Sequence, residues 1–323
     1  MMPLANLYST ITADLHEASR IFRDELVSDQ GFIADICRHV DQFHGKQLRP
    51  ALLLLSAQAC GGVTREHHTL AAVVEMVHIA TLVHDDVLDE ADIRRRAATV
   101  NRLWGIERAV LMGDFLFSHA YHLCSGLASQ FAARLIGSTA VTLCEGEMMQ
   151  NYHRENFDLT ESEYFDIINR KTASLIGVCG LLGAKYAGAD DATVRRMKAF
   201  GESLGIAFQI VDDILDLSGD EVETGKSLGR DVHKGKLTLP LIHYLANSAP
   251  AARAHVLTIL RGEDPQRYRQ IGRILADSES LDYANQAANN FVAAAREAIV
   301  DLPLSEAKAA LETMADFVLA RRQ

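Results

Sequence analysis

The chain of 323 residues has few features that would break it into separate domains. It contains only 6 prolines, and it has no Ser/Gly-rich linker and no low-complexity tract. Length alone would allow two domains, but without a linker we expect a single domain over residues 1–323. No apolar run approaches the roughly 18 residues that a membrane-spanning helix needs. The N-terminus also lacks a basic segment followed by an apolar stretch, so we expect neither a transmembrane helix nor a signal peptide.

Cysteine and positive charge are scarce as well. The five cysteines are odd in number and form no C-x-x-C pair, which predicts buried free thiols in a reducing cytoplasm; they are Cys37, Cys60, Cys124, Cys144 and Cys179. The 13 histidines show no zinc-binding spacing. A net charge of −11 argues against nucleic acid as the main partner.

Alternating β-branched residues are scarce too, and nearly every long stretch repeats its apolar residues at the helical period. This predicts an all-α protein. The expected helices cover residues 7–28, 50–60, 66–90, 106–128, 131–152, 161–187 and 191–217, and most of the chain beyond residue 237.

Glycines mark two special places in this helical pattern. Gly201 and Gly205 lie inside an expected helix, where glycine costs about 1 kcal/mol, so we expect a close approach of another helix there. Residues 218–237 alternate glycines with charges and predict a mobile loop that could act as a lid. Thr238 and Pro240 are typical of the start of the next helix.

The most informative feature is an acidic motif that occurs twice. The motif D-D-x-x-D appears at 85–89 and again at 212–216, each time directly after an apolar run. On a helix its first and third Asp lie four residues apart and share a face. Six such carboxylates in one cavity would repel strongly unless cations neutralised them. Mg²⁺ typically combines one or two carboxylates with waters and phosphate oxygens, so the pair of motifs predicts a site where metal ions hold a diphosphate.

Basic residues near these motifs could bind phosphate. Lys46 and Arg49 lie at an expected helix start, where backbone N–H groups add a partial positive charge. His78 precedes Asp85 by seven residues, about two helical turns, and therefore shares its face. The alternative for Lys46 and Arg49 is an exposed charged loop. The alternative for His78 is a core histidine whose hydrogen bonds are made within the protein.

Further basic residues follow the first motif and lie in later segments. Arg94, Arg95 and Arg96 carry the forked guanidinium that matches phosphate oxygens, although a solvated turn is the alternative. Lys171 and Thr172 lie in the middle of an expected helix, and by themselves they do not indicate a binding site. Lys226 and Lys236 lie in the expected loop and could close over a phosphate.

With these residues assembled, the chain closely resembles the trans-isoprenyl diphosphate synthase family, and its long-chain members such as octaprenyl diphosphate synthases most of all. The resemblance spans almost the whole chain to residue 322. Its motifs are G-K-Q-L-R-P at 45–50, L-V-H-D-D-V-L-D-E at 82–90, F-Q-I-V-D-D-I-L-D at 208–216 and G-K-L-T-L-P at 235–240.

The resemblance implies an all-α bundle of about ten or more helices around a deep central cavity, usually as a homodimer. It implies that Mg²⁺, as three ions with diphosphate bound, is held by Asp85, Asp86, Asp89, Asp212, Asp213 and Asp216. The allylic diphosphate would be bound by Arg94, Lys171, Thr172, Gln209 and Lys226, and Lys236 is a further candidate for substrate binding. Isopentenyl diphosphate would be bound by Lys46, Arg49, His78 and Arg95. Catalysis would rest on Asp85, Asp86, Asp89, Lys171, Asp212 and Asp213. The chain departs from the family at Arg96, where many members have Gly, and this puts the local turn in question.

Product length is predicted from the helix that precedes the first motif. Short-chain members of the family have a large aromatic residue four or five positions before the motif, whereas this chain has Ala80 and Thr81. Val77 and Val74, one and two turns deeper, are of medium size. We therefore expect an open tunnel and a product of C30 or longer, with octaprenyl, C40, as the best estimate from farnesyl diphosphate. The tunnel floor would come from bulky residues at 115–117.

Other functions are open at this point. A short-chain farnesyl or geranylgeranyl diphosphate synthase would share the motifs but not the small residues at 80 and 81. A class I terpene cyclase needs only one diphosphate site, whereas Lys46, Arg49 and Arg95 indicate two. A regulatory subunit would lack an intact acid motif, and a purely structural helical protein would not explain the two motifs. A long product further suggests quinone side-chain biosynthesis and a peripheral membrane contact for product release.

Overall fold

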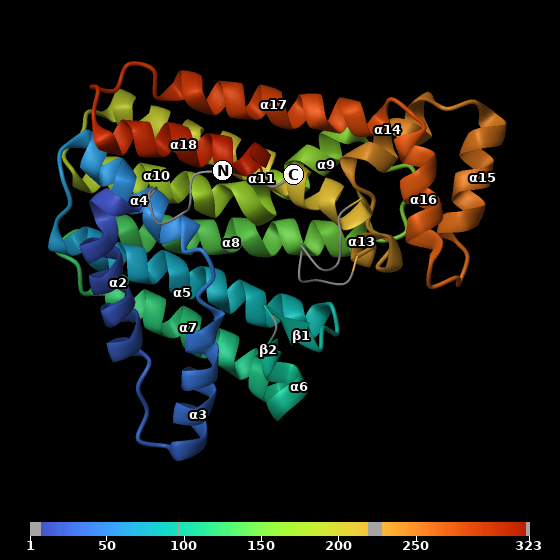
Figure 1. Cartoon of the computed structure of the whole chain (residues 1–323). Helices are drawn as coiled ribbons and strands as arrows, with labels where there is room; N and C mark the ends of the chain where they lie inside the picture. The colour runs from blue at the N-terminus through green and yellow to red at the C-terminus, as the bar shows by residue number, and fades with distance from the viewer. Residues whose placement is uncertain (1–7, 96, 219–227, 321–323) are drawn as a thin grey trace. The chain divides into compact units, whose positions relative to one another are not determined.

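The structure is a computed structural model that describes residues 8–95, 97–218 and 228–320 (Figure 1). The regular elements of this part of the chain are helical except for one small hairpin. In it, β1 (Ile93–Arg94) pairs antiparallel with β2 (Ala97–Ala98), with Ile93 opposite Ala98. The expected all-α class is therefore confirmed. No helix in the described ranges has both the length and the apolar character needed to cross a membrane.

The chain divides into two compact units, each assembled from several segments. The first unit comprises residues 1–140, 175–201 and 298–314. Its complete helices are η1 (Ser9–Ile11), α2 (Thr12–Glu25), α3 (Gly31–Val40), η2 (Asp41–Phe43), α4 (Leu48–Cys60), α5 (Arg65–Leu88), α6 (Val100–Trp104) and α7 (Ile106–Ser125). It also holds the first parts of α8 (Phe131–Tyr152), α11 (Asp191–Ser218) and α18 (Glu306–Ala320), and nearly all of α10 (Ser174–Tyr186).

The second unit comprises residues 141–174, 202–297 and 315–323. It holds the later parts of α8, α11 and α18. Its other helices are α9 (Glu161–Ile168), the π-helical turn η3 (Asn169–Ala173), α13 (Arg230–His233), α14 (Leu239–Asn247), α15 (Pro250–Leu260), α16 (Arg267–Ala276) and α17 (Ser280–Ala298), whose last residue falls in the first unit. The expectation of one domain over 1–323 stays a prediction.

Helix α5 is the centre of the first unit. It packs chiefly against α7, which lies beside it, and also against α2 and α4 (Figure 1). Between Leu70 and Ala80 its side chains are buried on every side apart from His78, which is partly buried. A helix that is apolar all round belongs in a core, because no face of it gains by meeting water. This helix delivers the first acid motif at its C-terminal end.

Several local expectations are confirmed. Helix α8 has the predicted bounds, and Thr238 occupies the N-cap position of α14, with a proline in the first turn. A Cβ added at Gly201 would lie 2.4 Å from the carbonyl oxygen of Ile176, so the predicted close helix approach exists at Gly201. Two of the five thiols differ from the expected burial: Cys144, on an outward face of α8, is exposed, and Cys60, at the end of α4, is only partly buried. Part of the expected lid, residues 219–227, lies outside the described part of the chain, and residues 230–233 form the short helix α13.

Candidate functional site

The first acid motif ends α5. Asp86 is almost fully buried, at 1% exposure, whereas Asp85 and Asp89 are partly exposed. The Arg94 guanidinium, from β1, donates to both carboxylate oxygens of Asp86 from Nε at 2.8 Å, and its Nη2 lies 2.7 Å from Oδ1. A charged, multiply bonded contact of this kind is strong because the surroundings exclude water. Asp86 therefore anchors the hairpin to the end of α5.

Cationic side chains gather near this motif. The charges of Arg49, Arg95 and Arg94 all act on His78, and together with the larger effect of burial they hold the pKa of His78 well below its usual range. The imidazole is thus neutral at neutral pH. The guanidinium of Arg95 lies over Gly45: a Cβ added there would come within 2.5 Å of the guanidinium carbon. The structure therefore brings four of the predicted basic residues together.

Three residues that were not predicted surround this cluster. Glu75 is a carboxylate at 3% exposure on α5, and its Oε1 lies 3.4 Å from Nδ1 of His44. The Tyr8 hydroxyl donates to the carbonyl of Lys46 at 2.6 Å and so ties down the loop before α4. Burial, and next the charge of Glu75, raise the pKa of Tyr8 well above its usual range. Glu75 lies three residues before His78, a same-face spacing that could have pointed to it.

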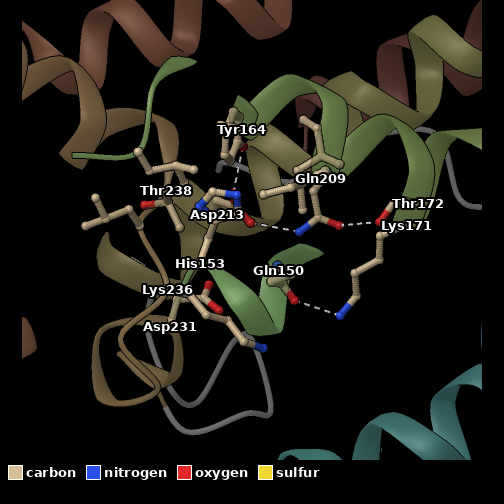
Figure 2. Close-up of a pocket in the computed structure, with 14 residues that line it drawn as sticks. Gln150, His153, Tyr164, Lys171, Thr172, Gln209, Asp213, Asp231, Lys236 and Thr238 are labelled. Carbon is tan, nitrogen blue, oxygen red and sulfur yellow. Dashed lines mark hydrogen bonds between the residues drawn. The ribbon is translucent and has the colours of Figure 1, made fainter. Parts of the chain in front are cut away.

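The second unit contains a pocket that receives many of the other predicted residues (Figure 2). The pocket combines apolar walls with two lysines, two carboxylates and several uncharged polar groups. It is lined by Gln150, His153, Leu159, Tyr164, Ile167, Ile168, Lys171, Thr172, Gln209, Asp213, Asp231, Lys236, Leu237 and Thr238.

A chain of hydrogen bonds runs through this pocket. The Thr172 hydroxyl donates to Oε1 of Gln209 at 2.9 Å, and Nε2 of Gln209 donates to Oδ1 of Asp213 at 2.7 Å. The hydroxyl of Tyr164 donates to the other oxygen, Oδ2, also at 2.7 Å. Figure 2 shows the three links as dashed lines that meet at Asp213 and Gln209. Tyr164 was not predicted, although it precedes Lys171 by seven residues, about two helical turns.

Two carboxylates of the second acid motif, Asp213 and Asp216, have raised pKa values. Burial raises the pKa of Asp213 well above its usual range, and the nearby charge of Asp231 raises it further, while the bonds from Tyr164 and Gln209 oppose this. Burial also raises the pKa of Asp216. Asp216 accepts the backbone N–H groups of Arg230 at 3.3 Å and Asp231 at 3.0 Å, so it fixes the start of α13.

Lys171 reaches the pocket from the π-helical turn. Its Nζ donates to Oε1 of Gln150 at 2.8 Å and forms an ion pair with Glu147. Both partners lie on α8, and neither was predicted. Lys236 lines the same pocket.

The six predicted metal-binding carboxylates thus differ in their surroundings. Asp86, Asp213 and Asp216 each have both carboxylate oxygens hydrogen-bonded to donors of the protein. In the described ranges, no three His, Cys, Asp or Glu side chains come close enough to hold an ion by themselves. An all-oxygen donor set still fits Mg²⁺, which needs only one or two carboxylates when phosphate oxygens complete its shell.

The remaining predicted residues are accounted for as follows. Ala80, Val77 and Val74 are buried on α5, and the hydroxyl of Thr81 donates to the carbonyl of His78 at 2.7 Å. Lys226 and Arg96 lie outside the described residues. Taken by itself, each unit places carboxylates beside cationic donors, an arrangement suited to binding phosphate groups together with a divalent cation.

Comparisons with known proteins agree with this chemistry. The sequence model of the family described as Polyprenyl synthetase matches residues 30–277. The octaprenyl diphosphate synthase of Haemophilus influenzae is 33% identical over 98% of this chain and 96% of its own length. A short chain isoprenyl diphosphate synthase of Methanothermobacter thermautotrophicus is 35% identical over 88% of each chain. The crystal structure of a polyprenyl synthase from Caulobacter crescentus, complexed with calcium and isoprenyl diphosphate, covers 99% of this chain and 98% of its own at 32% identity, with a TM-score of 0.94.

Proposed function

The chain belongs to the polyprenyl synthetase family and is a trans-prenyltransferase that makes a polyprenyl diphosphate, and from that premise we propose that it is a long-chain synthase. It condenses an allylic diphosphate, with farnesyl diphosphate as the starter, with successive isopentenyl diphosphates. The proposed end product is octaprenyl diphosphate, C40.

The reaction makes one carbon–carbon bond in each cycle. The allylic C–O bond breaks, diphosphate leaves with the electron pair, and the allylic carbocation is attacked by the double bond of isopentenyl diphosphate. Loss of a proton restores a double bond, and we propose that the released diphosphate accepts this proton. Fixed cationic donors favour the step because negative charge grows on the departing diphosphate.

We assign the two diphosphates to two different sets of residues, with Arg94 among those of the allylic diphosphate. In the second unit Lys171, Thr172 and Gln209 line one pocket, and we assign the allylic diphosphate to it. In the first unit we assign isopentenyl diphosphate to the cluster of Arg49, His78 and Arg95. The strongest local support is the Arg49 Nε, a buried donor that has no hydrogen-bond partner in the described ranges. Two cation sets argue against a terpene cyclase, which needs only one.

Mg²⁺ is the proposed metal, with three ions when a diphosphate is bound. We assign it to the carboxylates of the two acid motifs, which are Asp85, Asp86 and Asp89 in the first and Asp212, Asp213 and Asp216 in the second. When bound, the ions would neutralise the charge of the leaving diphosphate.

The observation that carries the long-chain assignment is the small size of Ala80, which is fully buried on α5 about one turn before the acid motif. A growing apolar tail that runs along this helix meets no large side chain at Ala80 or Thr81. Val77 and Val74 follow at successive turns.

Product analysis tests this proposal. Purified protein is incubated with farnesyl diphosphate, labelled isopentenyl diphosphate and Mg²⁺, with an EDTA control, and the dephosphorylated products are sized by chromatography. We expect a metal-dependent ladder that ends at C30 or beyond, and a ladder shortened to about C15–C20 in A80Y, because a buried aromatic ring would block the tail. A wild-type ladder that stops at C20, or an unchanged ladder in a folded A80Y variant, would overturn the chain-length assignment. No condensation at all would overturn the activity.

We also propose a homodimer. Helix α7 presents a row of exposed residues at helical spacing in which Val110, Leu111 and Tyr121 are 39%, 64% and 47% exposed, and Ile106 at its start is 63% exposed. A second copy of the chain would cover this apolar face, since an exposed patch of this kind on a helix usually marks an interface.

A further inference from the structure

The Lys171 side chain is held by two residues of α8 that the reaction scheme does not yet use. Glu147 forms an ion pair with its ammonium, and Gln150 accepts a hydrogen bond from Nζ at 2.8 Å (Figure 2 shows the Gln150 bond). Glu147 and Gln150 are three residues apart and so lie on one face of the helix. The side chains of Lys171 and Glu147 are only 22% and 19% exposed. The contact is therefore a partly buried one, where an ion pair is screened less than at the surface.

The backbone brings these partners together by an unusually close contact. A Cβ added at Gly146 would lie 2.5 Å from the backbone nitrogen of Lys171 and 2.8 Å from Cβ of Arg170. On one side of this glycine Glu145 pairs with Arg170 at 2.7 Å, and on the other Glu147 pairs with Lys171. The absence of a side chain at Gly146 thus lets α8 lie directly against the turn that carries Lys171.

The turn itself is π-helical. The N–H of Ser174 bonds to the carbonyl of Asn169, five residues back, and the turn spans Asn169–Ala173. Adjacent residues of an α-helix point about 100° apart, yet both Lys171 and Thr172 line the pocket. Such single-turn π-bulges are frequent at functional sites. The bulge presents both side chains to the pocket, and α8 fixes the longer and more flexible one.

We propose that Glu147, assisted by Gln150, is a positioning residue that orients the Lys171 ammonium for the diphosphate. The inference rests on the proposed function, in which Lys171 binds the allylic diphosphate. A lysine side chain loses rotamer freedom when it is fixed. Because Glu147 and Gln150 fix it before the ligand arrives, less ordering remains to oppose binding.

A carboxylate next to an anion site could also act in the opposite way, as a competitor that occupies the lysine. The two roles predict opposite signs. If Glu147 positions Lys171, removal of its charge weakens diphosphate binding. If Glu147 competes with the ligand, removal of its charge strengthens binding.

The test compares E147Q with E145Q. Both variants remove one negative charge from the same helix, two residues apart, but Glu145 pairs with Arg170 and not with Lys171. Three quantities are measured with Mg²⁺ present: the KM values for farnesyl and isopentenyl diphosphate, kcat, and the Kd of inorganic diphosphate by calorimetry. We expect E147Q to raise the farnesyl diphosphate KM and the diphosphate Kd about tenfold, with kcat and the isopentenyl diphosphate KM within about twofold. E145Q should leave all of them within about twofold, and E147D should restore part of the binding.

Unchanged or tighter binding in E147Q would overturn the inference, as would an equal loss in E145Q. If E147Q failed to fold, Q150M would replace it, because it removes the other contact of Lys171 at similar volume, and the same sign of change is expected. The calorimetric arm also separates this inference from the proposed function. A wild-type protein without condensation activity would refute the function, while the diphosphate Kd would still report whether Glu147 orients Lys171.

Discussion

The two cation sets differ in how individual charges are balanced. Lys171 has a carboxylate partner in Glu147, whereas the Arg49 guanidinium retains a buried Nε without an acceptor in the described ranges. Burial also lowers the pKa of Arg49, because the charged guanidinium loses its hydration inside the protein. A buried unsatisfied donor costs about 1–3 kcal/mol. A phosphate oxygen that accepted a hydrogen bond from Arg49 Nε would remove that cost. The unsatisfied donor therefore favours the binding of a phosphate group to the first cluster.

His78 gives a prediction that needs no substrate. Its pKa is held well below the usual range by burial and then by Arg49, Arg95 and Arg94. The unfolded chain takes up a proton at His78 as the pH falls below about 6.5, while the folded protein does not. Stability is therefore lost as the pH falls below that value, at up to about 1.4 kcal/mol for each pH unit. Above it, both states are neutral and no difference remains.

The measurement is urea unfolding of wild type and H78Q at pH values from 7.5 to 5.0. Because Gln carries no titrating proton, the stability of wild type relative to H78Q should fall as the pH falls. H255Q is the matched control, since His255 is exposed on α15 and the same change there should leave the pH dependence unaltered. Parallel curves for wild type and H78Q would contradict the assignment of a neutral His78.

At the scale of elements, the helices could be predicted because their apolar period is long and strong. The predicted range 131–152 coincides with α8, and 66–90 differs little from α5. The π-helical turn at 169–173 could not be predicted, because it depends on the contact of that backbone with Gly146, a residue more than twenty positions away. The hairpin at 93–98 was missed since it rests on the Arg94–Asp86 contact and not on any strand pattern.

The same distinction explains which site residues were found. The Asp motifs could be found from their composition and spacing, whereas Lys171-Thr172 were found only through the family resemblance. Glu147 and Tyr164 were found by neither route, because an acid or a tyrosine on a helix is usually a surface or packing residue. Their roles come from tertiary contacts that bring α8, α9 and α11 together within the second unit.

The Gly146 contact predicts the effect of adding one methyl group. In G146A the new Cβ would meet the backbone of Lys171, which cannot move away as a flexible side chain could. We expect a loss of about 1–3 kcal/mol of unfolding free energy and a raised KM for farnesyl diphosphate as Lys171 shifts. Urea unfolding and steady-state kinetics measure the two effects.

G31A is the matched control for that substitution. Gly31 begins α3, and a Cβ added there meets nothing within 4 Å. The change should be neutral or stabilise the protein by about 0.4–1 kcal/mol, because alanine restricts the unfolded chain. If G146A were as stable as G31A, the helix contact would be looser than the structure has it.

At the scale of the whole molecule, helix α7 combines two different faces. One face packs closely against its own unit, and the other leaves apolar residues exposed. Its inner face, with Met112, Leu116 and Ala120, is buried. On the outer face Leu111 is 64% exposed, so folding of one chain does not bury its apolar side chain. Burial of such a side chain by a second copy would contribute about 1.5–3 kcal/mol. The proposed homodimer accounts for that face.

We therefore expect L111E to dissociate the dimer, because a charge at the centre of an apolar interface has no partner and must be desolvated. Light scattering after size exclusion should give about twice the chain mass of 35.5 kDa for wild type and a single-chain mass for L111E. V300E is the control, since Val300 is a 54% exposed apolar residue outside α7 and the same change there should leave the mass at that of the wild type. A wild-type protein of single-chain mass would refute the dimer, and a dimeric L111E would place the interface on another face.

Diphosphate binding by the dissociated variant would then show whether the dimer is needed for binding. Because the residues proposed to bind each diphosphate belong to a single chain, folded L111E should still bind inorganic diphosphate in the presence of Mg²⁺.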